Sequence, residues 1–317
     1  MLEVCRYIPK QSEPETEESG FGVTDLWLLS VVLVWGFNAV ASKFTLELLA
    51  PLAVLGVRMA GVGLLLAFVV VVMRRERVFA ERKTLWLFLI GGGLMAVQNG
   101  TFFWAFKLTT ASEASLLIST SPLWVAILVN LCGFEAFCRR NWFGLLMALG
   151  GVSMVILGGG GGGEYAPARV QGDLIMVFSA IIFGVYMVIM RGVIQKHGAV
   201  RVLAASYLIG AVLLAPFTVT PLVDAPWGEM DVLRTLALSY IVVMAGGYAF
   251  MIWYRTIRQT SASRTAIYAY LVPVIAAISA WIFLDEHLAV VQIIGLAVTI
   301  VGVYLAKPDP DSICRVG

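Results

Sequence analysis

The clearest group of side chains that could do chemistry is a set of hydroxyls and a proline at helical spacing: Ser112, Ser115, Ser119 and Pro122. If 112–131 is a helix, intervals of three, four and three residues place the set on one face. A proline beside hydroxyls kinks a helix and leaves a backbone carbonyl free to bind a polar ligand. Small residues also let helices pack closely. The set therefore predicts either a binding face, with Pro122 at a helix kink, or a packing face.

Amides and tyrosines are the next candidates, because each can donate and accept hydrogen bonds. Asn38 falls in the middle of one apolar run and Asn99 lies late in another. Each of them either lines a binding pathway or makes a bond between helices. Four tyrosines could stack on an organic ligand or hydrogen-bond to it: Tyr186, Tyr248, Tyr268 and Tyr270.

Three charged residues lie at or inside the ends of apolar runs. Lys43 and Arg58 could attract a carboxylate, or they could extend their charged groups to the polar boundary of an apolar layer. Glu113 follows Thr110 by three residues, which is the spacing of a helix capping box. We treat all three as charges of a pathway or of the architecture.

The sequence lacks the patterns of an enzyme or a metal site. Its two histidines, His197 and His287, are far apart, and the metalloprotease motif HExxH does not occur. Cys132 and Cys138 are separated by an interval that suits zinc poorly, with no histidine nearby. We therefore predict no catalytic residue, no metal and no cofactor.

These polar residues belong to a strongly apolar chain. Of its 317 residues, 60% are hydrophobic and 13% are charged, and the mean hydropathy is +0.90. Soluble domains carry about 25% charged residues, so the composition excludes an ordinary soluble enzyme. A net charge of +2 leaves no basic footprint for nucleic acid. The composition predicts an all-α integral membrane protein with the lipid bilayer as its partner.

Apolar runs of the length that crosses a bilayer as a helix, about 20 residues, recur along the chain. We predict ten transmembrane helices, at 26–46, 52–73, 85–105, 112–131, 142–158, 172–190, 202–220, 233–253, 264–284 and 288–306. Lysine and arginine concentrate in 74–83 and in the alternate loops that follow it. Because basic loops stay in the cytoplasm, both termini are predicted to be cytoplasmic. The expected location is the plasma (inner) membrane.

The sequence also contains an internal repeat. A shift of 151 residues places 109–124 on 260–275, with Thr109 on Thr260. The same shift places Pro122 on Pro273, which we expect to be a second helix kink. Because each half has an odd number of spans, the second half enters the membrane upside down. Inverted repeats form a binding site near the bilayer midplane and let it open to either side.

The repeat and the composition set the domain boundaries. We predict a disordered cytoplasmic tail at 1–25, a first five-helix repeat at 26–157, a glycine-rich linker at 158–171, a second five-helix repeat at 172–306 and a cytoplasmic tail at 307–317. The fold class is thus ten transmembrane helices as two inverted repeats around a central cavity.

Several short motifs, in this order, resemble the drug/metabolite transporter superfamily and its EamA-like family. They are WGFNAVASKF in the first span, Arg58 in the second, the TxAS…P segment, an acidic residue before the last span, and GLAVTIVGVYLA. The resemblance covers about 26–306. It implies ten helices, a central cavity, and export or exchange of small metabolites or amino acids. The GFEAFCRRN segment departs from the family pattern, so the role of Glu135 is less defined than that of Glu286.

The sequence therefore predicts a secondary transporter that moves small organic metabolites, such as amino acids, outward by alternating access. A multidrug proton antiporter needs an acidic residue at a span centre, and the sequence offers none. A phosphosugar or nucleotide-sugar exchanger needs basic residues deep in the cavity, for which Arg264 is a candidate near the cytoplasmic edge. A non-transporting membrane scaffold or sensor is the alternative of another class. The oligomeric state stays open, and a monomer is compatible with the sequence.

Overall fold

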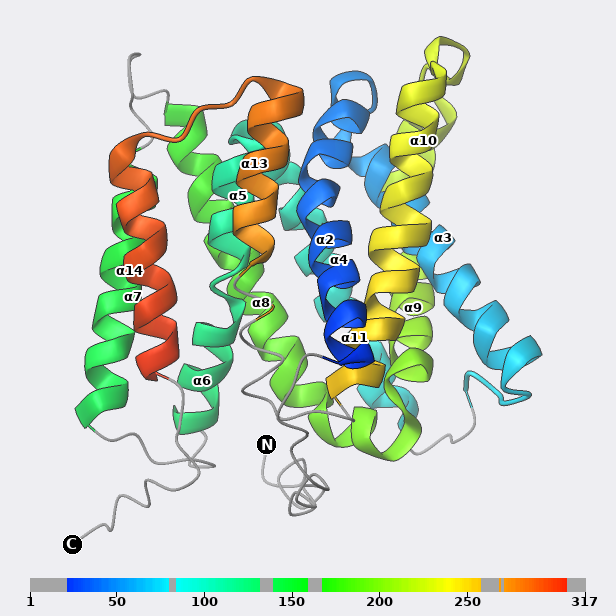
Figure 1. The fold of residues 1–317 in the computed structure, drawn as a ribbon. Helices are drawn as coiled ribbons and strands as arrows, with labels where there is room; N and C mark the ends of the chain where they lie inside the picture. The colour runs from blue at the N-terminus through cyan, green and yellow to red at the C-terminus, as the bar shows by residue number, and fades with distance from the viewer. Residues whose placement is uncertain are drawn as a thin grey trace, which may run out of the picture.

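The computed structural model describes residues 22–79, 84–131, 139–158, 167–257, 268 and 271–306, and all regular structure in them is helical (Figure 1). In chain order the helices are α2 (Val23–Leu48), α3 (Pro51–Phe68), η1 (Val69–Met73), α4 (Leu85–Leu108), α5 (Ala111–Ile118), α6 (Ser121–Leu131), α7 (Arg139–Gly158), α8 (Pro167–His197), α9 (Ala199–Val223), η3 (Trp227–Glu229), α10 (Val232–Tyr240), η4 (Ile241–Tyr248), α11 (Ala249–Ile257), α13 (Val272–Leu284) and α14 (Val290–Ala306).

Helices form because apolar runs of this length can satisfy their backbone polar groups only within one segment when lipid surrounds them. Six helical segments within the described ranges are long and apolar enough to cross a membrane: Val23–Leu48, Pro51–Met73, Leu85–Leu108, Pro167–His197, Ala199–Val223 and Val232–Thr256. Large apolar side chains such as Leu64, Phe217 and Ile293 are exposed on the outside of the bundle. The protein is an all-helical integral membrane protein.

The predicted span 112–131 is not one continuous helix. The helix α5 ends at Ile118, residues 119 and 120 form a turn, and α6 begins at Ser121. Ser112 and Ser115 are buried, whereas Pro122 is exposed. The single face expected for these residues is therefore interrupted, because the turn changes the helical register between the serines and the proline.

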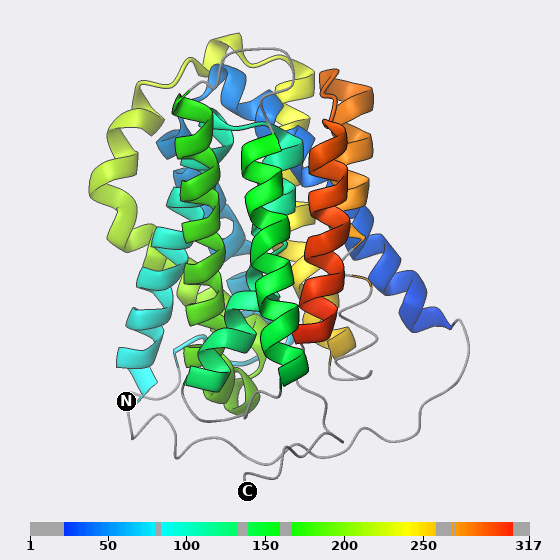
Figure 2. The same cartoon turned by 90° about the vertical axis from the view of Figure 1, so that its left-hand side faces the viewer.

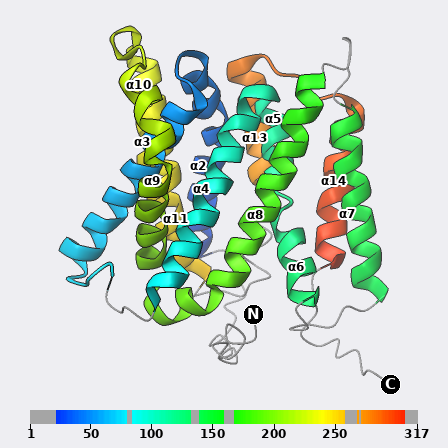
Figure 3. The same cartoon turned by 180° about the vertical axis from the view of Figure 1, so that it is seen from behind.

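The helices pack in recurring pairs. The helix α3 packs on α9, α4 packs on α8, and α7 packs on α14 along one edge of the bundle (Figures 1 and 3). The helix α2 contacts α13 on one side and α10 with α11 on the other, while α5 and α6 contact α8. Figure 2 shows α7 and α14 side by side from the edge of the bundle.

Close helix contacts depend on glycine, for example at Gly36 and Gly151. A Cβ built on Gly36 of α2 would lie 2.4 Å from Cγ2 of Ile275 on α13. On α7, a Cβ on Gly151 would lie 2.4 Å from Oγ1 of Thr299 and 2.6 Å from the carbonyl of Gly295 on α14. Small residues at such crossings allow close backbone approach, which is a main source of packing energy between helices in lipid. The small residues of α7 and α14 therefore form a packing seam.

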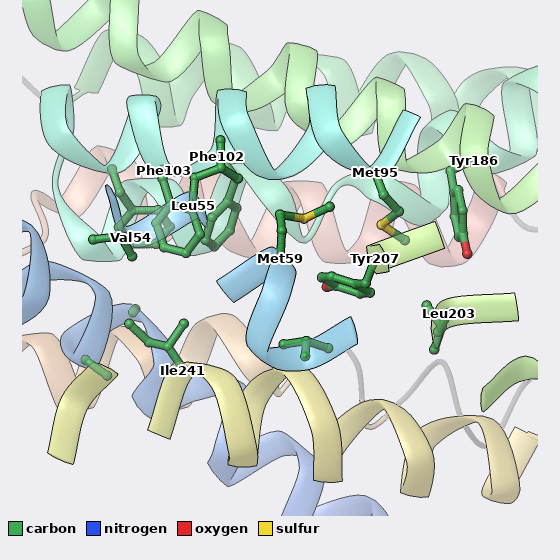
Figure 4. Packing of buried hydrophobic residues seen from close by; sticks show 14 of the residues in the cluster. Val54, Leu55, Met59, Met95, Phe102, Phe103, Tyr186, Leu203, Tyr207 and Ile241 are labelled. Atoms are coloured by element: carbon green, nitrogen blue, oxygen red, sulfur yellow. The ribbon is translucent and has the colours of Figure 1, made fainter. Parts of the chain in front are cut away.

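The main apolar core lies between α3, α4, α8 and α9. Figure 4 shows Met59 of α3, Phe103 of α4 and Tyr207 of α9 pointing into it. All three side chains are essentially inaccessible to solvent. This core fixes the helices that carry the buried polar groups described next.

Candidate functional site

Glu113 is the centre of a polar network at the end of the bundle where α4 ends and α8 begins. Its side chain is fully buried, and Arg169 of α8 donates from Nε to Oε2 over 2.7 Å and from Nη2 to Oε1. Gln292 of α14 also donates to Oε1. Thr109 and Thr110 donate to Oε2 over 2.9 and 3.0 Å. An ionised carboxylate only accepts hydrogen bonds, so these donors favour a charged Glu113.

Asp173 joins this network through Thr109. The Thr109 hydroxyl lies 2.5 Å from Asp173 Oδ1, and the Asp173 residue is 1% exposed. The second oxygen, Oδ2, is buried and has no hydrogen-bond partner within the described part of the chain. We call Thr109, Thr110, Glu113, Arg169, Asp173 and Gln292 the Glu113 network.

Glu286 binds the start of α5 from the loop between α13 and α14. Its carboxylate accepts hydrogen bonds from the backbone N–H groups of Ala111 and Ser112 over 2.8 and 2.9 Å, and from Ser112 Oγ over 2.9 Å. A carboxylate at a helix N-terminus satisfies free donors and complements the helix dipole. Glu286 thus connects the loop between α13 and α14 to α5, the helix that carries Glu113.

Both lysines near this end of the bundle bind backbone carbonyls. Lys43 donates to the carbonyl of Thr109, and Lys107 donates to the carbonyl of Leu46 over 3.0 Å. Lysine at a helix C-terminus satisfies carbonyls that lack partners within the helix. Lys43, predicted as a pathway or structural charge, is bonded to a backbone carbonyl in this conformation.

Deeper in the bundle, α2 and α3 carry buried polar atoms that no described residue satisfies. These atoms are Oδ1 of Asn38, Oγ of Ser42, and Nε and Nη1 of Arg58. All three residues are less than 9% exposed, and the Arg58 guanidinium lies 5.5 Å from the centre of the Phe103 ring. A buried polar group without a partner costs about 1–3 kcal/mol, and more when it is charged. Such atoms are suited to bind a polar ligand.

Ser42 and Arg58 lie at a similar depth in the bundle. Ser42 comes shortly before α2 ends at Leu48, and Arg58 comes shortly after α3 begins at Pro51. At 1.5 Å per residue, Ser42 lies about 10 Å before the end of α2, and Arg58 lies about 10 Å after the start of α3. Asn38 is one further turn along α2, on the same face as Ser42.

Asn99 has a different environment from Asn38. Its Nδ2 donates to the Met95 carbonyl and to Gln98 Oε1, each over 3.0 Å. Gln98 in turn donates to Ser179 Oγ of α8 over 3.2 Å. Asn99 is therefore satisfied by α4, and Gln98 makes the bond between helices.

Three of the four predicted tyrosines are described, and each has a different hydrogen-bond partner. Tyr186 is fully buried, with its hydroxyl 3.4 Å from Ser206 Oγ. The Tyr248 hydroxyl lies 2.8 Å from Ser30 Oγ, and Tyr268 donates to Asp25 Oδ1 over 2.8 Å. Tyr270 lies outside the described residues.

The serines of the predicted binding face bond to their own helix. Ser115 donates to the carbonyl of Ala111 over 2.8 Å, and Ser119 donates to the carbonyl of Ser115 over 2.7 Å. Pro122 and Pro273 lie in the first turns of α6 and α13, where proline needs no amide hydrogen. Both prolines thus begin helices rather than interrupt them.

Sequence reasoning missed Asp173, Ser42 and Gln292 as candidate residues. One signal was available for Asp173. Asp25 and Asp173 each precede an aromatic–glycine pair by the same interval, Trp35–Gly36 and Phe183–Gly184. An acidic residue that recurs near the start of corresponding apolar spans indicates a buried role.

Charged groups buried inside a bundle of apolar helices are rare and mark functional sites of membrane proteins, including substrate and ion pathways. A sequence model of the EamA-like transporter family matches residues 22–157 and 170–307. The chain belongs to this family and is a membrane transporter.

Relatives extend over most of the chain. An uncharacterized transporter of Archaeoglobus fulgidus is 28% identical over 288 residues, which cover 89% of this chain and 96% of the relative. The uncharacterized transporter YoaV of Bacillus subtilis is 22% identical over 284 residues, covering 88% and 95%. A solved structure titled "Crystal structure of protein" has a TM-score of 0.64 and 22% identity, covering 90% of this chain and 96% of that one. The last similarity concerns the fold alone.

Proposed function

We propose that this protein is a secondary transporter that exports small organic metabolites bearing a carboxylate, such as amino acids, by alternating access. The observation that carries the proposal is the buried guanidinium of Arg58, whose Nε and Nη1 have no partner within the described part of the chain. Arginine binds carboxylates through paired N–H groups. Ser42 and Asn38 supply further polar atoms on the neighbouring α2.

Alternating access requires two halves that can exchange conformations. Glycine packing supports this part of the proposal. Gly36 of α2 meets Ile275 of α13, and Gly184 of α8 meets Trp124 of α6. These two contacts correspond to each other under the repeat of the sequence. The pairing of α4 with α8 likewise corresponds to the contact of α2 with α10 and α11.

Orientation follows from the charges. The basic segment 74–79 lies at the end of the bundle opposite the Glu113 network, so we propose that it faces the cytoplasm. Both termini would then be cytoplasmic and the membrane would be the plasma membrane. The Glu113 network would close the outer side, because it links α5, α8 and α14 through buried bonds. A central cavity would form when these bonds break.

Tracer counterflow tests the proposal. Purified protein is reconstituted in liposomes preloaded with a mixture of amino acids and other small carboxylates, and each labelled compound is added outside in turn. We expect transient tracer accumulation for at least one carboxylate. The Arg58→Met variant should lose it, whereas Arg77→Met, at an exposed arginine outside the helices, should keep it. Absence of accumulation across the whole panel would favour a scaffold or sensor, and accumulation only of organic cations would favour a multidrug exchanger.

A further inference from the structure

The hydroxyl of Thr109 stands between two acidic side chains. It contacts Glu113 Oε2 at 2.9 Å and Asp173 Oδ1 at 2.5 Å. A threonine hydroxyl carries one hydrogen, so it can donate to only one of the two. If both acids were ionised, the other contact would bring two oxygen lone pairs together without a hydrogen between them. A proton on one of the acids removes this conflict.

The surroundings decide which acid holds the proton. Glu113 accepts from Arg169, Gln292 and Thr110 as well as from Thr109. Within the described residues, Asp173 has a single hydrogen-bond contact, at Oδ1, and its buried Oδ2 has no hydrogen-bond partner. An ionised carboxylate so poorly satisfied is costly to bury, whereas a neutral carboxyl is much less so.

We propose that Asp173 is a proton-binding site whose occupation is linked to closure of the end of the bundle formed by the Glu113 network. In the structure described here, Asp173 is neutral and donates its hydrogen to Thr109 Oγ1. Thr109 then donates its own hydrogen to the ionised Glu113. When the network separates and water reaches Asp173, the O–H bond breaks and the proton passes to water on that side of the membrane.

The remaining charges around Asp173 are few. Arg169 shares α8 with Asp173, and Glu113 reaches it from α5. Lys43 and Glu286 interact electrostatically with this pair from α2 and from the loop before α14. The helix α6 has no charged residue, and Arg201 of α9 binds the Val78 carbonyl at the opposite end of the bundle. Arg169 attracts Asp173 electrostatically, but its hydrogen bonds described here go to Glu113.

The linkage has a defined sign. The closed state binds the proton more tightly, so a rise in external pH favours the open state. One proton separates the two states, which limits the change in their ratio to about tenfold per pH unit. This inference rests on the proposed function for its direction toward the outside, but the proton site itself does not.

Infrared difference spectroscopy of the purified protein tests the site without any substrate. A protonated carboxyl has a C=O stretching band distinct from the bands of a carboxylate. We expect this band at neutral pH in the wild type and in the control Asp224→Asn, which removes an exposed acid from the same end. Asp173→Asn should lack it. A band that survives in Asp173→Asn, or that is absent from the folded wild type, overturns the proposal.

A thiol reporter tests the linkage. Ala114 is fully buried beside Glu113, and Ala114→Cys in a background without the native cysteines reports opening of the network to an impermeant external reagent. Because the thiolate is the reactive form, each labelling rate is divided by the rate of an exposed cysteine, Asp224→Cys, at the same pH. We expect this corrected rate to rise with external pH, by up to about tenfold per unit. Asp173→Asn mimics the neutral acid and should give a slow corrected rate that does not change with pH, while Asp224→Asn should behave like the parent.

The outcomes separate the proposals. An unchanged pH slope in Asp173→Asn overturns the linkage. Failure of counterflow with the infrared band intact removes the transport proposal and leaves the proton site. Successful counterflow without the band removes the proton site and leaves transport.

Discussion

Gly36 of α2 lies so close to Ile275 of α13 that a Cβ on the glycine would come within 2.4 Å of Cγ2 and 2.7 Å of Cβ of the isoleucine. A branched side chain attached at Cβ cannot move away by rotating its outer end. Glycine is therefore required for the close approach of these helices, both of which also belong to the proposed moving halves.

The first prediction concerns this contact. Gly36→Ala should destabilise the protein by about 1–3 kcal/mol, because the core is overpacked. Gly184→Ala should cost less, since its Cβ would lie 3.1 Å from Trp124 Cβ. Gly93→Ala is the control, because nothing lies within 4 Å of the added atom. Thermal unfolding in detergent measures all three, and equal melting temperatures for Gly36→Ala and Gly93→Ala would contradict the geometry.

The seam between α7 and α14 gives a second prediction. Gly151→Leu should separate the two helices, because backbone atoms of Gly295 and Thr299 lie within 2.6 Å of its Cβ. We expect a loss of about 3 kcal/mol, at the upper end for overpacking. Gly150→Leu places the same side chain where nothing lies within 4 Å. The difference in unfolding temperature between the variants is the measurement, and a stable Gly151→Leu would show that the seam adapts.

Glu113 provides a third prediction. Glu113→Gln removes the buried negative charge that faces Arg169. Because the Arg169 side chain is 33% exposed and stays partly hydrated, we expect a loss of about 1.5–3 kcal/mol, the value of charge-assisted hydrogen bonds. Glu47→Gln changes an exposed glutamate that lies 3.2 Å from Arg234, and should cost less than about 1 kcal/mol. Denaturation of both purified variants compares them. Similar losses would mean that the Glu113 pair contributes no more than a surface pair.

Arg58 gives a prediction for the transported compound. Arg58→Lys keeps the charge but cannot form paired N–H bonds to a carboxylate. If one charge-assisted bond worth about 1.5–3 kcal/mol is lost, KM should rise about 10- to 100-fold. The KM for the carboxylate found by counterflow is the measurement, with Arg77→Lys at an exposed arginine as control. An unchanged KM in Arg58→Lys would assign Arg58 to packing against Phe103.

Topology supplies the last prediction. In a background in which serine replaces the native cysteines, Arg77→Cys should react with an impermeant thiol reagent only in inverted vesicles. Asp224→Cys should react in intact cells, because it lies at the other end of the bundle. The native cysteines to be replaced are Cys5, Cys132, Cys138 and Cys314. The reverse labelling pattern would place the Glu113 network on the cytoplasmic side.

The helical nature of the chain and its family could be predicted because long apolar runs and ordered motifs are properties of local sequence. The break before Ser121 has a local signal, because Ser-Thr-Ser-Pro at 119–122 is typical of a turn followed by a helix start. The prediction of one helix over 112–131 with a kink at Pro122 placed these residues inside the helix, whereas the structure places them at its interruption. The residues of the Glu113 network are far apart in the sequence, and only the packing of α5, α8 and α14 brings Glu113, Arg169 and Gln292 together.

Among the residues with buried, unpartnered atoms, some could likewise be predicted from the sequence and one could not. Asn38 and Arg58 could be singled out because polar residues in apolar runs are rare. Ser42 was missed, because a serine satisfies itself easily on its own helix, as Ser115 does. Whether a given serine has a partner depends on side-chain orientation, which the sequence does not specify.

The bonds of Lys43 and Lys107 have a mechanical consequence. Lys43 of α2 reaches the end of α4, and Lys107 of α4 reaches back to the carbonyl of Leu46 near the end of α2. These two reciprocal bonds hold the ends of α2 and α4 together. We therefore expect this end of the molecule to open at α5, α8 and α14, where the acids and Arg169 meet.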